Sequence, residues 1–246
     1  MNLQTLPYCG AAPLPGELWQ RFNLDPALLA SLTLLTFLHA RSVKGAQRVS
    51  AVTGWLIAAA ALVSPLCALS VALFSARIGQ HMLLLLLAAP LIAYAWPTRS
   101  AWHASRAWLV AAAFFAFLWL WHMPGPYDAT FSSTPTYWLM HVTLFGSAIL
   151  LWRDLLHAPP GRAVEVLLIG TLTSMQMGLL GAVLTFASHP LFSWHFITTA
   201  AWGLTPLRDQ QLGGVLMWVP GIALFLLLAA RAFALLWRRL ESEEPA

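Results

Sequence analysis

Three histidines lie directly beside a methionine, and these residues are the best candidates for metal ligands in the chain. The pairs are His81-Met82, His122-Met123 and Met140-His141. Imidazole nitrogen and thioether sulfur together suit copper, and the thioether favours Cu(I) in particular. Adjacent residues on a helix point about 100° apart, so the two members of a pair cannot both face one ion fully. Packing histidines and gap-filling methionines would give the same pattern, and that interpretation stays open.

Two acidic residues and a glutamine lie where they could support such a site. Gln80 directly precedes His81, and Asp128 and Asp209 lie between apolar segments. A carboxylate that hydrogen-bonds a ligating histidine orients it, so we expect these three residues to hold the ligands or to contact a partner protein. Asp209 has a competing interpretation as the cap of the last helix, because a helix N-terminus favours an anion.

Cys9 and Cys67 are the only two cysteines. Two cysteines are too few for a disulfide framework. A single bridge between them is possible, and Cys67 could instead add a soft ligand from the outer half of its apolar segment.

Several other chemistries are excluded by the sequence. The single lysine, Lys44, lies between the first two apolar segments, so no Schiff-base lysine is available in the last helix for retinal. The chain has no phosphate-binding loop, no His-Glu-x-x-His and no Gly-x-Ser-x-Gly. It also lacks the Cys-x-x-Cys pair of thiol oxidoreductases. We therefore expect a protein that is not an enzyme.

The elements that must position these residues are membrane-spanning helices. Of the 246 residues, 59% are hydrophobic and 9% are charged, whereas soluble domains carry about 25% charged residues. Apolar runs long enough to cross a bilayer recur along the chain, and each span must satisfy its own backbone hydrogen bonds. The sequence predicts an all-α, polytopic membrane helix bundle with seven transmembrane helices, at about 24–40, 49–74, 79–96, 106–122, 135–152, 162–187 and 211–237.

The basic residues indicate how these helices are oriented. With the N-terminus outside, ten lysines and arginines lie on the inner side, and only Arg21, Arg77 and Arg208 lie on the outer side. This bias favours an N-out/C-in arrangement and places His81, His122 and His141 on the outer side. We expect an extracytoplasmic segment at 1–23, one transmembrane domain at 24–240 and a cytoplasmic tail at 241–246. The net charge of +4 then reflects topology and gives no reason to expect nucleic acid as a partner.

Four motifs, in order along the chain, resemble those of the caa3-type CtaG family of cytochrome c oxidase assembly factors. They are Gln80-His81-Met82-Leu83-Leu84 followed by Ala89-Pro90, Trp121-His122-Met123-Pro124 followed by Tyr127-Asp128-Ala129, His141, and Pro206-Leu207-Arg208-Asp209-Gln210-Gln211-Leu212-Gly213-Gly214. The resemblance covers about residues 8–240. It implies a multi-pass protein of the bacterial inner membrane that assembles haem-copper oxidase, with oxidase subunits, other copper chaperones and the lipid bilayer as partners. It also implies copper as a candidate cofactor.

Arg77 departs from the family pattern. Many members have a second histidine four residues before the histidine of the Gln-His-Met motif, and here that position is Arg77. Residues four apart share one helical face, so a two-histidine clamp on this helix is unavailable. This departure does not affect His122 or His141 as candidate ligands.

The hypothesis from the sequence is a transient copper site on the outer side of an oxidase assembly factor. A metal-free scaffold that stabilises oxidase subunits is the first alternative. A haem- or quinol-linked redox protein with axial histidines is the second. A transporter is disfavoured, because ionisable residues in the middle of the spans are almost absent.

Overall fold

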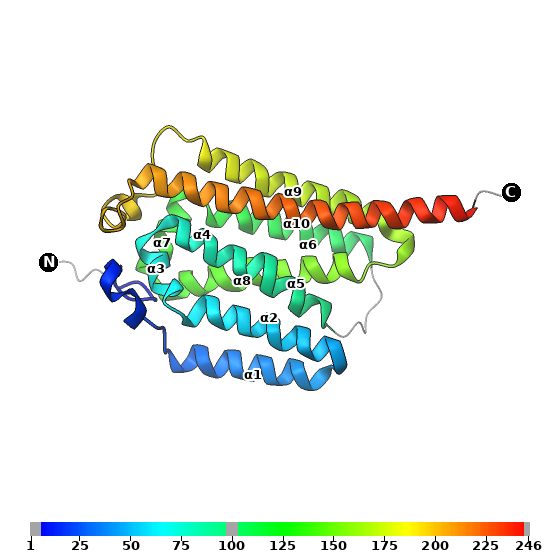
Figure 1. The fold of residues 1–246 in the computed structure, drawn as a ribbon, viewed down its shortest axis with the longest axis horizontal. Coiled ribbons are helices and arrows are strands. Elements are labelled where there is room, and N and C mark those ends of the chain that lie inside the picture. The colour runs from blue at the N-terminus through cyan, green and yellow to red at the C-terminus, as the bar shows by residue number, and fades with distance from the viewer. Residues whose placement is uncertain (1–5, 97–102, 244–246) are drawn as a thin grey trace.

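The protein is a bundle of helices that run side by side along its long axis (Figure 1). The computed structural model describes residues 6–96 and 103–243. Within these ranges all regular structure is helical, which confirms the predicted all-α class. One end of the bundle carries the N-terminal segment, α3 and α7 (Figure 1); it is called the N-terminal end below.

The main helices of the bundle, with α4 and α5 counted as one, alternate in direction and are joined at its ends. They are α1 (Pro26–Ser42), α2 (Gly45–Val63), α4 (Phe74–Met82), α5 (Ala89–Tyr94), α6 (Ala104–Trp121), α8 (Thr134–Leu156), α9 (Ala163–Thr185) and α10 (Pro206–Glu243). A π-helical stretch, Leu83–Ala88, joins α4 to α5 and makes them one continuous helix. Two short helices, α3 (Leu66–Ala72) and α7 (Pro124–Ser132), lie at the N-terminal end.

Six helices are long and apolar enough to cross a membrane. They are Gly45–Val63, Phe74–Tyr94, Ala104–Trp121, Thr134–Leu156, Ala163–Thr185 and Pro206–Arg231. The first predicted span corresponds to α1, which has 17 residues and packs beside α2 (Figure 1). The described chain is therefore a multi-pass membrane protein with six clear candidate spans, and α1 lies next to them. The end of the predicted tail, 244–246, lies outside the described residues.

The second predicted span, 49–74, is wrong at its C-terminal end. α2 ends at Val63, and α3 is a separate helix that begins after Pro65. Proline has no N–H and its ring clashes with the carbonyl four residues before it, which kinks or breaks a helix; here α2 ends two residues before Pro65. Cys67 consequently lies in a short helix at the N-terminal end of the bundle and not within a span.

The third predicted span begins too late. α4 begins at Phe74, five residues before the predicted start at 79. This places Arg77 inside a helix with 1% of its surface exposed, and not in a loop between two spans. That Arg77 lies on the outer side stays a prediction. Arg77 and the polar residues around it lower the mean hydropathy of this segment, so the apolar run in the sequence does not include the first turn of α4.

Glycines allow α9 and α10 to approach closely. A Cβ atom at Gly181 would lie 2.9 Å from the carbonyl oxygen of Gly214 and equally close to Cβ of Trp218. A Cβ atom at Gly213 would lie 2.5 Å from the ring of Phe74, at the start of α4. The Gly213-Gly214 pair therefore brings α10 against both α9 and α4.

Candidate functional site

The three motif histidines converge from three different helices at the N-terminal end. His81 lies near the C-terminal end of α4, His122 follows the last residue of α6, and His141 lies two turns into α8. The ring centroid of His81 is 5.6 Å from that of His122 and 5.7 Å from that of His141. Their exposed fractions are 1%, 4% and 5%. This group is called the histidine cluster below.

The hydrogen bonds of the cluster leave ring nitrogens free. Nδ1 of His122 donates to the Leu118 carbonyl at 2.6 Å, and Nδ1 of His141 donates to the Tyr137 carbonyl at 3.0 Å. Nε2 of each of these rings is buried and has no partner among the described residues, and neither nitrogen of His81 has one. Buried polar atoms without a partner are costly and rare. A metal-ligating histidine typically donates its other N–H to a carbonyl in this manner.

The spacing of the rings is close to that of ligands around one ion. Two imidazoles bound through nitrogen to the same ion, at about 2.0 Å each, have ring centroids about 5.1–5.5 Å apart at tetrahedral to trigonal angles. The observed separations exceed this range by only a few tenths of an ångström. Among the described residues, however, no three His, Cys, Asp or Glu side chains are arranged so that they could hold a metal ion as they stand. The ring of His81 lies between those of His122 and His141 in edge-to-face contacts, so the three rings must reorient before they could bind one ion together.

The three methionines are placed differently from one another. Met140 is fully buried and Met82 is 7% exposed, whereas Met123 is 52% exposed at the surface. Met82 and Met140 thus share the buried interior with the histidine rings. Met123 lies on the surface beside His122, where an incoming molecule could reach it.

Arg77 is a buried cation held mainly by aromatic rings. Its guanidinium carbon lies 4.0 Å from the ring centroid of Phe131, 5.2 Å from that of Tyr127 and 5.8 Å from that of Tyr137. It donates one hydrogen bond, to Oγ1 of Thr130 at 2.5 Å, and its Nε has no partner. In residues 6–96 and 103–243 it forms no ion pair. Cation–π contacts therefore stabilise a full positive charge one helical turn from His81.

Asp209 anchors α4, the helix that carries Arg77 and His81. It is fully buried, and its carboxylate accepts hydrogen bonds from the backbone N–H of Phe74 at 2.6 Å and of Ser75 at 3.1 Å. The Ser75 hydroxyl donates a third, at 2.5 Å. Asp209 thus satisfies the free N–H groups of α4 and complements its dipole. The interpretation of Asp209 as a cap of the last helix is wrong, because the helix that it caps is α4.

Gln80 and Asp128 connect other parts of this region. Gln80 donates from Nε2 to the Ala61 carbonyl on α2 at 2.8 Å, and its buried Oε1 has no described partner. Asp128 on α7 accepts from the Ser193 hydroxyl at 2.5 Å. Gln80 therefore fixes α4 against α2, and Asp128 fixes α7 to the loop between α9 and α10.

A second buried histidine interaction was not predicted. The Tyr127 hydroxyl and Nε2 of His195 are 2.7 Å apart, and Nδ1 of His195 lies 3.3 Å from the Ala72 carbonyl. Burial lowers the pKa of His195 to about 3, so this loop histidine is neutral at physiological pH. The sequence indicated the Tyr127-Asp128-Ala129 motif and a loop histidine on the same side of the membrane, but it did not indicate that Tyr127 and His195 are partners.

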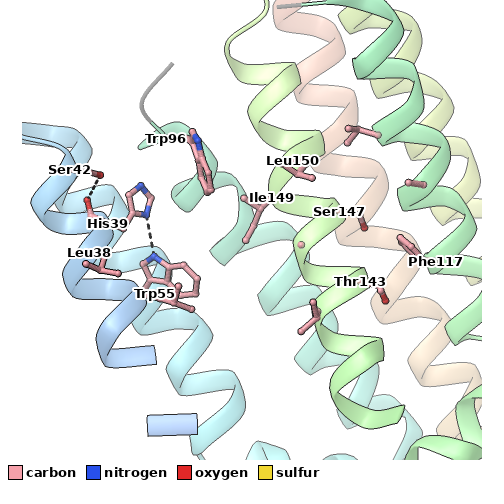
Figure 2. A pocket seen from close by; sticks show the side chains of 15 residues that line it. Leu38, His39, Ser42, Trp55, Trp96, Phe117, Thr143, Ser147, Ile149 and Leu150 are labelled. Atoms are coloured by element: carbon pink, nitrogen blue, oxygen red, sulfur yellow. Dashed lines mark hydrogen bonds between the residues drawn. The ribbon is translucent and has the colours of Figure 1, made fainter. Parts of the chain in front are cut away.

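An apolar groove separates α1 and α2 from α6 and α8 (Figure 2). It has a volume of about 750 Å³, and an adjoining cavity of about 510 Å³ extends toward the N-terminal end, where His141 is part of its wall. In the groove, Nδ1 of His39 accepts from Trp55 Nε1 at 3.2 Å and Nε2 lies 3.3 Å from the Ala95 carbonyl. Both nitrogens of His39 are thus engaged, whereas His141 offers a free nitrogen.

The sequence model of the cytochrome c oxidase caa3 assembly factors (Caa3_CtaG) matches residues 32–239. The chain belongs to this family. No curated protein and no solved structure matches it. All three residues of the histidine cluster fall within the matched range, as does Asp209, whereas the N-terminal segment before α1 precedes it.

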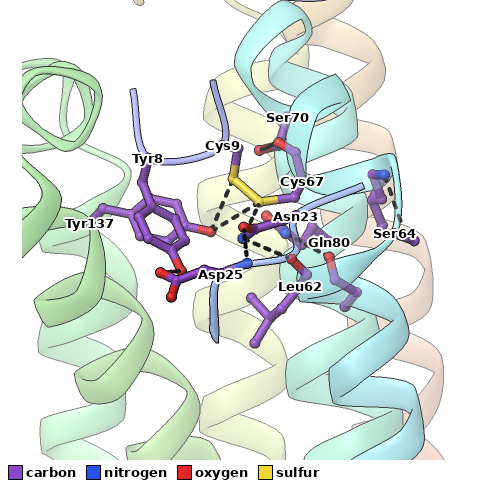
Figure 3. Close-up of a disulfide and its surroundings, with 12 residues drawn as sticks. Tyr8, Cys9, Asn23, Asp25, Leu62, Ser64, Cys67, Ser70, Gln80 and Tyr137 are labelled. Carbon is purple, nitrogen blue, oxygen red and sulfur yellow. Dashed lines mark hydrogen bonds between the residues drawn. A yellow bond between two sulfur atoms is a disulfide. The ribbon is translucent and has the colours of Figure 1, made fainter. Parts of the chain in front are cut away.

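The N-terminal segment of this CtaG-family protein is joined to α3 by a disulfide between Cys9 and Cys67 (Figure 3). The two Cα atoms are 5.5 Å apart, and Cys67 is fully buried. The Tyr137 hydroxyl lies 3.5 Å from the sulfur of Cys9 and 3.8 Å from that of Cys67. While the bridge is closed, Cys67 is not the additional soft ligand that the sequence also allowed, because a disulfide sulfur is not a thiolate.

Proposed function

We propose that this assembly factor binds copper transiently on His81, His122 and His141 and delivers it to cytochrome c oxidase. The observation that carries the proposal is the set of buried, unpartnered Nε2 atoms on rings whose centroids are 5.6 and 5.7 Å apart. Three neutral imidazoles suit copper, and Met82 and Met140 supply soft sulfur in the same interior. The incomplete arrangement of the cluster suits a carrier, because a carrier must release its ion.

The topology that goes with this proposal has seven transmembrane helices, with α1 as the first and with the N-terminus outside. The protein then lies in the bacterial inner membrane, with the histidine cluster at its periplasmic side. This is the side from which copper reaches oxidase subunits. Oxidase subunits and other copper chaperones are the proposed partners, and the cavity at His141 offers them a lateral route to the cluster.

A metal-free scaffold is the alternative that a specific observation favours, because the described residues contain no ready three-ligand group. In that case, α1 and the groove beside it would serve only as contact surfaces for oxidase helices. A haem protein is disfavoured by the packing of the cluster. The ring of His81 contacts the other two edge to face, at interplanar angles of 82° and 75°, which leaves no room for a porphyrin between any axial pair that includes His81.

Anaerobic Cu(I) titration of the purified protein against a chromogenic chelator tests the proposal. Ascorbate keeps copper reduced and leaves the disulfide closed. We expect one equivalent in the wild type, with strongly reduced affinity in His122→Ala and His141→Ala. His189→Ala is the matched control, because His189 is exposed and bonds only its neighbour Ser188. Equal copper content in all four proteins contradicts copper binding by the cluster, and retained co-purification with oxidase subunits in the variants then supports the scaffold.

A further inference from the structure

We propose that Cys9 and Cys67, when reduced, form a second copper site of two thiolates, and that closure of the disulfide releases its ion beside the histidine cluster. The site goes beyond the proposed function, since it uses no residue of the cluster and lies partly in the segment before the range that matches the family. Thiolates are soft ligands that select Cu(I).

The positions of the two cysteines allow a two-coordinate ion. Their Cα atoms are 5.5 Å apart. With metal–sulfur bonds of about 2.3 Å, a linear site places two sulfurs about 4.6 Å apart. Cys67 is fixed in a buried helix, whereas Cys9 lies in a turn closed by the hydrogen bond from the Gly10 N–H to the Pro7 carbonyl. Rotation of the side chains with a small shift of this turn is sufficient to reach that separation.

The surroundings of the sulfurs suit a thiolate pair. Nδ2 of Asn23 donates to the sulfur of Cys67 at 3.6 Å, and the Tyr137 hydroxyl lies within 3.8 Å of both sulfurs (Figure 3). Two thiolates with one Cu(I) carry a net charge of −1, which a buried site must offset. The guanidinium of Arg77 lies 5.8 Å from the Tyr137 ring and forms no ion pair in the described part of the chain. Arg77 thus supplies a positive charge that is not neutralised by a close ion pair.

Tyr137 connects this site to the histidine cluster. Its ring centroid is 4.3 Å from that of His141, and its carbonyl accepts the hydrogen bond from Nδ1 of the same histidine. One residue therefore contacts both sulfurs and one imidazole of the cluster. An ion that leaves the sulfurs is one residue, Tyr137, away from His141, whose Nε2 has no partner among the described residues.

Release of the ion follows from thiol–disulfide exchange. An external disulfide, such as that of a thiol–disulfide oxidoreductase, accepts two electrons from the cysteine thiolates, takes two protons from solvent and becomes a dithiol. The two cysteine thiolates lose these electrons and form the S–S bond. The copper ion leaves as Cu(I), unchanged in oxidation state, because neither sulfur retains its thiolate charge.

The test compares reduced and oxidised full-length protein in detergent, under anaerobic conditions and after removal of a phosphine reductant. We expect reduction to add one equivalent of Cu(I), with Cu–S scattering in X-ray absorption, in both the wild type and the His122→Ala/His141→Ala variant. The Cys9→Ser/Cys67→Ser variant should lose this added equivalent. The same stoichiometry before and after reduction, or an added equivalent that persists in the serine variant, overturns the proposal.

The difference between the two redox states separates this proposal from the proposed function. If the histidine cluster binds no copper, the oxidised wild type is empty, but the equivalent added by reduction remains. If the thiolate site does not exist, the oxidised protein still binds its one equivalent, and reduction adds none. Size-exclusion elution of the serine variant, compared with that of the wild type, reports whether the fold survives without the bridge.

Discussion

Replacement of Arg77 by glutamine should raise the affinity of the histidine cluster for metal ions, and more for divalent ions than for Cu(I). Arg77 precedes His81 by one helical turn, and its charge has no carboxylate partner among the described residues. A guanidinium at this position lies about 8 Å from an ion bound to the His81 ring. Its charge therefore opposes every cation that binds there.

The magnitude follows from Coulomb's law. At an effective dielectric constant of about 20 and a distance of about 8 Å, two unit charges repel each other by about 2 kcal/mol. Removal of the charge should strengthen Cu(I) binding about 30-fold and Zn(II) binding about 1,000-fold. Arg77 would thus act as a selectivity device that favours a singly charged ion by about 30-fold over a doubly charged one.

Competition titrations with Cu(I) and Zn(II) on the wild type, Arg77→Gln and Arg77→Lys provide the assay. Arg77→Lys retains the charge and should keep the wild-type preference, whereas Arg77→Gln should lose it. Arg77→His, which restores the residue of many family members, should strengthen binding further by adding a second imidazole on the same face. Equal changes for the two ions, or none, would falsify the electrostatic argument, because a purely structural effect does not depend on the charge of the ion.

Three further predictions concern the framework around the site. Asp209→Asn places an amide N–H₂ where carboxylate oxygens accept hydrogen bonds from two backbone N–H groups. The substitution should lower the free energy of unfolding by about 2 kcal/mol, measured by denaturation in detergent. An unchanged midpoint contradicts the anchoring role. Gly181→Ala should cost about 1–3 kcal/mol through overpacking of α9 on α10, whereas Gly146→Ala, which meets no atom within 4 Å, should be close to neutral in the same assay. The pKa of Asp25 is lowered by hydrogen bonds from the Tyr8 hydroxyl and a backbone N–H. The stability that Asp25 contributes is therefore present above its unfolded pKa near 4 and is lost as the pH falls through its lower folded pKa. Asp25→Asn should remove this acid dependence in pH-resolved thermal melts, and an identical pH profile in both proteins refutes the assignment.

The convergence of the histidines could be predicted because it depends on topology. Apolar runs indicated the helices, and the basic residues placed His81, His122 and His141 at one side of the bundle. Helices that alternate in direction bring such residues to a common depth, and the structure places the ring centroids of His122 and His141 within 5.7 Å of that of His81. Helical periodicity does not determine the side-chain rotamers of these histidines, so their free Nε2 atoms could be identified only in the folded structure.

Other features could not be predicted because they are long-range contacts between polar groups. Hydropathy treats Arg77 as a loop residue, but three aromatic rings from α7 and α8 bury it. Asp209 has the position of a local cap, yet its partners precede it by more than 130 residues. The Cys9–Cys67 bridge spans 58 residues, and the sequence left it as one of two options.

The carboxylate of Asp209 also has a consequence for the order in which the protein matures. α10 is synthesised after α4 and α9, and it carries the group that holds the start of α4. A chain that has been synthesised only through α9 contains all three histidines of the cluster, but His81 lies on a helix that still lacks its anchor. The histidine cluster therefore takes its final arrangement only after α10 has been made and has packed against α4, although all of its histidines are made earlier.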